Sequence, residues 1–246
     1  MPSLDPQLIA QMTEWRRQLH RHPECGFDLP LTAKFVADKL ESFGIEVVRN
    51  VGKTGVVGIL RGTEASLSSG AAPAGIGLRA DMDALHIDEQ NSFEHRSCHE
   101  GKMHACGHDG HSAMLLGAAC HLAQHRNFKG TVYFIFQPDE EHGQGAQAMI
   151  DEGLFERFQI DEVYGLHNLP GMPEGSFTVR PGSLMASESS FEIVIEGTGG
   201  HAAMPHTGVD PLVTGSQVVL ALQTLVSRNL SAIHETAVVS ATEFIT

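Results

Sequence analysis

The residues best suited to chemistry lie between positions 103 and 111, where one thiol, three imidazoles and one carboxylate occur within nine residues. Cys106 and His108 are two residues apart, so in an extended segment their side chains point the same way and could bind one ion. A thiolate beside an imidazole favours zinc or a similar divalent ion over magnesium or calcium, which prefer oxygen ligands. The pair therefore predicts a metal site.

The apolar residues that follow this stretch predict a buried helix, which places Cys106 in the loop at its N-terminus. That position favours the thiolate form of a cysteine. Two other interpretations stay open. A single Cys or His beside an apolar helix usually serves packing, and Cys106 could instead be the nucleophile of a cysteine amidase with a histidine partner.

Other metal-competent groups follow predicted strands. The β-branched and aromatic run 131–137 is typical of a strand buried on both faces, and shorter strands are predicted at 75–79 and 161–166. The groups that follow them are Asp81, the pair Glu140 and Glu141, and His167. Because parallel α/β sheets bind ligands at the carboxyl ends of their strands, we expect these groups to meet Cys106 and His108 at one edge of a sheet.

Two neighbouring carboxylates at a metal site can divide the work. One binds the ion, and the other stays free to take a proton from metal-bound water, whose pKa the ion lowers. Glu140 and Glu141 suit this division, although such a pair is commonly two solvated glutamates at a turn. Asp81 could orient a ligand imidazole or bridge ions, and spacing alone does not choose between it and Asp83.

Strands that alternate with helices predict an α/β fold with a mostly parallel sheet and right-handed crossovers. We expect helices over 3–20 and 31–43 and an exposed loop over 63–74. From residue 189 the pattern changes to strand 190–196, helix 210–228 and strand 237–245. We therefore predict one domain over 1–187 and a second, small and incomplete domain over 188–246.

Seven other histidines are less informative. His201 follows two glycines in the predicted small domain and is either a substrate-facing histidine or a turn residue. His20 and His22, taken alone, are expected in a loop. Four others, His95, His99, His121 and His125, are expected to face solvent.

The totals exclude several classes of function. The 246 residues carry 16 basic and 30 acidic side chains, a net charge of −14, so nucleic acid is not an expected partner. No apolar stretch approaches the roughly 20 residues of a membrane helix, and we expect no membrane partner and a cytoplasmic protein. The four cysteines do not form a disulfide framework and are expected to be reduced.

Five segments together carry a family resemblance: 79–85, 103–109, 137–141, 165–168 and 199–206. They resemble the hippurate hydrolase and aminoacylase-type amidohydrolases, part of the metallopeptidase group that includes succinyl-diaminopimelate desuccinylase. The resemblance implies a di-metal catalytic domain with an inserted α+β lid that forms homodimers. Its two divalent ions would be zinc, manganese, cobalt or nickel.

The resemblance also implies roles for individual residues. The implied metal ligands are Cys106, His108, Glu141 and His167, and the implied catalytic residues are Glu140 as general base, Asp81 as the assisting aspartate and His201 as the lid histidine. The implied reaction is hydrolysis of the amide bond of an N-acyl amino acid. Glu140 would deprotonate metal-bound water, and the ions would hold the oxyanion.

Two departures from the family pattern limit this expectation. The family has one more ligand histidine beyond the lid, in a part that this chain does not contain, and His86 replaces the usual proline. We therefore expect an apparently C-terminally truncated member with an incomplete lid. A third interpretation is an inactive fragment that binds metal or dimerises.

Overall fold

A computed structural model describes residues 5–64, 75–231 and 237–246. Most of the loop predicted over 63–74 lies outside the described residues. The chain divides into two compact units, Met1–Gly171 and Met172–Thr246. We describe each unit by itself.

The first unit is built on a five-stranded sheet in the order β1-β2-β4-β3-β5. The strands are β1 (Glu46–Val51), β2 (Gly55–Arg61), β3 (Gly75–Asp81), β4 (Thr131–Gln137) and β5 (Glu162–Gly165). β3 is parallel to β4 and β5, whereas β2 is antiparallel to β1 and β4. The predicted α/β class is confirmed, but the sheet is mixed, because the short turn between β1 and β2 allows only an antiparallel hairpin.

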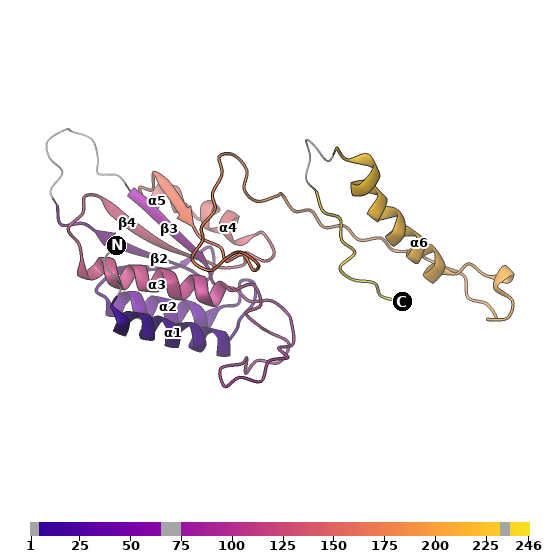
Figure 1. Ribbon diagram of the computed structural model, residues 1–246, viewed down its shortest axis with the longest axis horizontal. Coiled ribbons are helices and arrows are strands. Elements are labelled where there is room, and N and C mark those ends of the chain that lie inside the picture. Colours follow the sequence, from indigo (N-terminus) through magenta and orange to yellow (C-terminus); the bar gives the residue numbers. More distant parts are fainter. Residues whose placement is uncertain (1–4, 65–74, 232–236) are drawn as a thin grey trace. The chain divides into compact units, whose positions relative to one another are not determined.

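Helices cover both faces of this sheet. α1 (Pro6–Arg21), α2 (Pro30–Ser42) and α3 (His108–Gln124) lie together on one face, and the shorter α4 (Gly145–Asp151) and α5 (Leu154–Arg157) belong to the other (Figure 1). Alternate strand residues point to opposite faces. In β4, Phe134 and Phe136 accordingly join the core under α1, α2 and α3, whereas Tyr133 and Ile135 join the core under α4 and α5.

The loop between α1 and α2 is attached to the segment that follows β3. The side-chain oxygens of Glu24 accept hydrogen bonds from the backbone N–H groups of Leu31 and Thr32, at 3.2 and 2.8 Å, and so cap α2. The backbone oxygen of Glu24 accepts a hydrogen bond from Ala84 N at 2.7 Å. This loop therefore fixes the backbone directly beside Asp83.

The second unit contains α6 (Pro211–Thr224), continued by a π-helical turn (Leu225–Asn229), and a 3-10 turn (Pro205–Thr207). Asp210 caps α6 by accepting from Leu212 N at 2.9 Å, as expected of a helix that starts near 210. The segments predicted as strands, 190–196 and 237–245, are not in strand conformation. A strand needs a hydrogen-bonded neighbour, and the described part of this unit has a single isolated bridge, between Thr198 and Val209. Among the helices of the described residues, none has the length and apolar character to cross a bilayer.

The packing of α3 predicts a contrast between two of its neighbouring residues. Leu116 is fully buried, so Leu116→Ala should cost roughly 2–5 kcal/mol of unfolding free energy through lost contacts and a cavity. Met114, on the same helix, is 42% exposed, and Met114→Ala should change it by only about 0.5 kcal/mol. Urea unfolding followed by circular dichroism measures both. Equal losses would show that α3 is not packed on the sheet as described.

Candidate metal and catalytic site

Asp81 ends β3 and is completely buried. It accepts a hydrogen bond from His111 Nδ1 at 2.7 Å and another from Arg79 Nη1 at 2.9 Å. Burial alone would raise the pKa of Asp81, but the hydrogen bond from His111 and the charges of His108 and Arg79 lower it to about 2. Asp81 is therefore a fixed negative charge behind the site.

His108, the first residue of α3, is oriented by Asp83. Its Nδ1 donates to the backbone oxygen of Asp83 at 2.9 Å and lies 3.3 Å from that residue's carboxylate. The other ring nitrogen, Nε2, is buried and has no hydrogen-bond partner among the residues that the structure describes. It lies 3.7 Å from Asp81 Oδ2, 3.7 Å from Glu140 Oε2 and 3.8 Å from Glu141 Oε1. The ring thus presents one free nitrogen to three carboxylates.

The two glutamates sit in a turn that follows β4. Asp139, the residue before them, has a φ of 47°, which is uncommon for any residue other than glycine. Its backbone N–H donates to Gly26 O at 3.1 Å, and its carboxylate accepts from His142 Nδ1 at 2.6 Å. The N–H of Glu141 donates to Asp83 Oδ2 at 3.1 Å. Asp83 therefore contacts both His108 and the glutamate turn.

Cys106 and His167 meet although they are far apart in the sequence. Cys106 Sγ lies 3.4 Å from His167 Nε2. His167 Nδ1 donates to the backbone oxygen of Asn168 at 2.7 Å, which leaves Nε2 free to face the sulfur. Gly107, between Cys106 and His108, has a φ of 100° and turns the chain into α3.

These groups fit a metal centre. Three overlapping sets of residues could each hold an ion, because the ligand atoms within each set lie within 4.8 Å of one another. The sets are Cys106, His108 and His167; Asp81, His108 and His111; and His108, Glu140 and Glu141. A thiol, imidazoles and carboxylates suit zinc and its neighbours among the divalent ions. Two buried atoms, His108 Nε2 and Glu141 Oε1, have no partner within the described part of the chain, lie 3.8 Å apart in this cluster and would each gain a partner in a bound cation.

The protonation of Cys106 differs from the expectation based on its helix position. Burial raises the pKa of the thiol, and the charges of Glu141, Glu140 and Asp81 raise it further, to about 12. The helix N-terminus that should favour a thiolate is outweighed by these carboxylates. A cation in the cluster would reverse that balance, because metal coordination deprotonates a thiol.

Several polar residues of the site were not assigned from the sequence. His111 Nε2 accepts a hydrogen bond from Asn168 N at 3.1 Å, so His111 joins Asp81 to the loop that carries His167. His104 is buried, and its two ring nitrogens have no partner in residues 5–64, 75–231 and 237–246. Burial lowers the pKa of His104 to about 4. The only available signal was the density of histidines in 103–111, which did not tell these roles apart.

His201 belongs to the second unit. Its side chain is exposed, and its Nδ1 accepts a hydrogen bond from Ala203 N at 3.1 Å, as in a local turn. Its role as a substrate-facing histidine stays a prediction.

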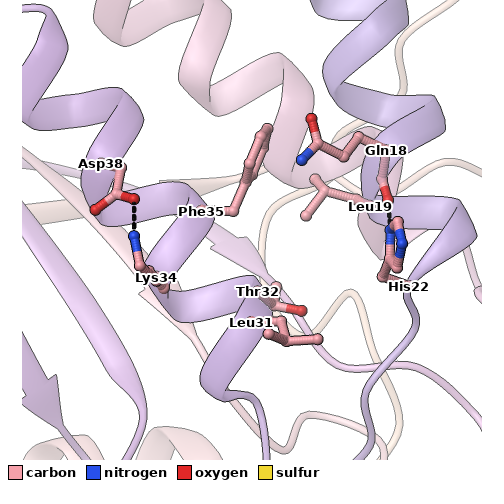
Figure 2. A pocket seen from close by; sticks show the side chains of 8 residues that line it. All are labelled: Gln18, Leu19, His22, Leu31, Thr32, Lys34, Phe35 and Asp38. Atoms are coloured by element: carbon pink, nitrogen blue, oxygen red, sulfur yellow. Dashed lines mark hydrogen bonds and ion pairs between the residues drawn. The ribbon is translucent and has the colours of Figure 1, made fainter.

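A hollow of about 370 Å³ lies between α1 and α2, away from the metal-competent cluster (Figure 2). Its apolar wall includes Leu19, Leu31 and Phe35. Three of its polar side chains have partners of their own: Lys34 pairs with Asp38, and His22 Nδ1 donates to the backbone oxygen of residue 18. No group in it is placed for hydrolysis, so we do not assign the active site there.

Comparison with known proteins agrees with the geometry of the cluster. The model of Peptidase family M20/M25/M40 matches residues 77–244, which include every candidate ligand. The chain belongs to this family. Among M20 structures it resembles the YXEP protein of Bacillus subtilis, described as a dinuclear metal-binding peptidase, with a TM-score of 0.69 and 34% identity over 89% of this chain and 57% of that one.

Two curated relatives are a hydrolase and a deacetylase by name. The chain is 45% identical over 241 residues to hippurate hydrolase of Campylobacter jejuni, covering 97% of this chain and 61% of the relative. It is 42% identical over 240 residues to N-acetylcysteine deacetylase of Bacillus subtilis, covering 97% and 60%. The predicted family is thus confirmed, and the chain spans about three fifths of the length of these relatives.

The turn between the two loop ligands gives a sharp test of the site. In Gly107→Ala the alanine would have to adopt the unfavourable φ of 100°, and its Cβ would lie 2.3 Å from Asn168 Oδ1. We expect a loss of roughly 1–3 kcal/mol in unfolding free energy and weaker zinc binding. In Gly110→Ala the added Cβ meets nothing within 4 Å among the described residues, so this variant should keep zinc binding and lose no unfolding free energy, with a gain of up to about 1 kcal/mol. Urea unfolding and zinc titration against a competing chelator measure the two effects; a harmless Gly107→Ala would contradict the described loop.

The low pKa of Asp81 predicts an acid dependence of stability in the metal-free protein. The folded pKa of about 2 lies below the ordinary 3.8, so ionised Asp81 stabilises the fold above pH 3.8 and this contribution is lost as the pH falls toward 2. The difference in unfolding free energy between the wild type and Asp81→Asn should shrink by about 2 kcal/mol across that interval. Chemical denaturation in the presence of a chelator measures it. A difference independent of pH would refute the assignment.

Proposed function

We propose that the protein is a metal-dependent amidohydrolase that cleaves the amide bond of N-acyl amino acids to a carboxylate and a free amino acid. The observation that carries the proposal is that two sets of candidate ligands share His108: Cys106, His108 and His167, and His108, Glu140 and Glu141. The ligand atoms within each set lie within 4.8 Å of one another. These residues all lie within the segment 77–244 that matches the M20 family model, which supports the proposed hydrolysis.

In this proposal two divalent ions are held by Cys106, His108, Glu141 and His167. Bound ions would polarise the substrate carbonyl and lower the pKa of water. The chain itself orients the ligands. The carboxylate of Asp83 lies 3.3 Å from Nδ1 of His108 and accepts a hydrogen bond from the backbone N–H of Glu141, so Asp83 is a stronger candidate than Asp81 for the carboxylate that orients a ligand imidazole. Asp81 instead holds His111 and, through it, the His167 loop.

Glu140 is proposed as the general base. Of the two neighbouring glutamates, Glu141 has the more buried side chain, 18% exposed, and a backbone N–H held by Asp83. Glu140 is 37% exposed and therefore open to water and substrate. It can take a proton from the attacking water at its carboxylate and return that proton to the leaving amine. Relatives named for hippurate and N-acetylcysteine support a small N-acyl amino acid as substrate, without fixing the acyl group.

The cysteine-nucleophile alternative is disfavoured by the surroundings of Cys106. A nucleophilic cysteine needs a lowered pKa. Here burial and three carboxylates raise the pKa to about 12. Association of two copies through the second unit, assistance by His201 and a cytoplasmic location remain further parts of the proposal.

Glu140→Gln tests the assignment directly. It should leave zinc content near normal, since Glu140 is not a proposed ligand, and lower turnover of hippurate or N-acetyl amino acids by at least about 100-fold. Metal analysis and amine release, measured on the same metal-loaded complete protein, give both readouts. Chelation should abolish turnover, and zinc, manganese, cobalt or nickel should restore it.

Two results would contradict the proposal. Turnover that survives chelation but is lost on thiol alkylation would support the cysteine amidase. Metal binding without turnover in the wild type, across this substrate series, would support the inactive metal-binding fragment.

A further inference from the structure

A buried network of charges lies directly behind the candidate metal ligands. His20, only 2% exposed at the end of α1, donates from Nδ1 to Asp109 Oδ2 at 2.7 Å and from Nε2 to Glu89 Oε1 at 3.0 Å. Arg16 Nε lies 2.8 Å from the same oxygen of Asp109. Burial lowers the pKa of His20, but its two carboxylate partners raise it above its ordinary value.

The network joins three segments that are distant in the sequence. His20 and Arg16 belong to α1, Glu89 belongs to the long loop before the Cys106 segment, and Asp109 lies in the first turn of α3. The loop is also attached to α1 through the hydrogen bond from Cys98 N to Arg21 O, at 2.9 Å. His20 is therefore the point at which α1, this loop and α3 are held together.

Asp109 connects the network to the site because it directly follows His108. Asp109 is 1% exposed, and its second oxygen accepts from Gly110 N at 2.8 Å. Its position is thus fixed on one side by His20 and Arg16 and on the other by the backbone of α3. His108 is in turn held by Asp83 from the opposite direction.

We propose that His20 is a positioning residue that holds Asp109, and through it the Cys106–His108 loop, in the geometry that binds metal. The inference rests on the proposed function, since it concerns the same centre. His20 touches neither metal nor substrate. Its effect is expected on the affinity for metal, beyond any effect on folding.

Two substitutions separate the bond to Asp109 from the bond to Glu89. An asparagine amide can replace the Nδ1 donor of histidine, and a glutamine amide can replace the Nε2 donor. His20→Asn keeps the bond to Asp109, whereas His20→Gln keeps the bond to Glu89 and releases Asp109. We expect His20→Gln to weaken zinc binding about 10- to 100-fold, as loss of a group that supports a ligand does, and His20→Asn to stay within about threefold of the wild type.

Zinc affinity is measured by competition with a chromophoric chelator, on full-length protein shown to be folded by circular dichroism. The visible spectrum of the cobalt-loaded protein should change in His20→Gln and not in His20→Asn. Leu154→Ala, in the core on the other face of the sheet, is the control: it should lower stability with zinc affinity unchanged. If His20→Gln does not fold, Asp109→Asn, which keeps the size of the side chain, should show the same loss of affinity.

The outcomes separate the inference from the proposed function. If the wild type binds zinc and His20→Gln or Asp109→Asn binds it equally well, the network only supports the fold and the inference is overturned. Equal losses in His20→Gln, His20→Asn and Leu154→Ala would overturn it in the same way. If the wild type itself binds no zinc, the proposed function fails and this inference fails with it.

Discussion

The hydrogen bond from His108 Nδ1 to the backbone of Asp83 is the interaction on which the centre depends. It fixes the ring so that Nε2 carries the free lone pair and points at carboxylates 3.7 to 3.8 Å away. Carboxylates gathered around a buried imidazole nitrogen that has no hydrogen-bond partner among the described residues are costly in the absence of a compensating charge. A cation at this point would offset that cost, and this is why the arrangement indicates a metal centre more strongly than any single ligand does.

The sheet makes this geometry possible. β3 and β4 are parallel and in register, with Asp81 opposite Gln137, so the segment with Asp83 and the turn with Glu140 leave the sheet side by side. β5 is parallel to β3 on its other side and delivers His167 to the same end. The remaining ligands come from the loop before α3, whose turn at Gly107 lets Cys106 and His108 face one cluster. The segments after β3, β4 and β5 thus meet because these strands are parallel, and the loop before α3 joins them through its turn at Gly107.

Much of this arrangement could be predicted from the sequence, because its signals are local. The β-branched run of β4 and the polar groups after each strand predicted the edge of the sheet at which the ligands meet. The choice between Asp81 and Asp83 could not be made, because both follow the same strand and only the position of the His108 ring separates them. His20 was expected in a loop but is buried at the end of α1. This could not be predicted, because its partners Asp109 and Glu89 lie 89 and 69 residues away in the sequence. The prediction of strands at 190–196 and 237–245 was wrong for a related reason. A strand depends on a pairing partner, which a local sequence pattern does not reveal.

Zinc X-ray absorption spectroscopy on the zinc-loaded protein tests the central claim most directly, because it reports which atoms surround the ion. If Cys106, His108, Glu141 and His167 bind together, the nearest shell should contain sulfur at about 2.3 Å as well as nitrogen and oxygen at about 2.0–2.2 Å. The sulfur contribution should vanish in Cys106→Ser. A shell of nitrogen and oxygen alone in the wild type would contradict the proposed centre.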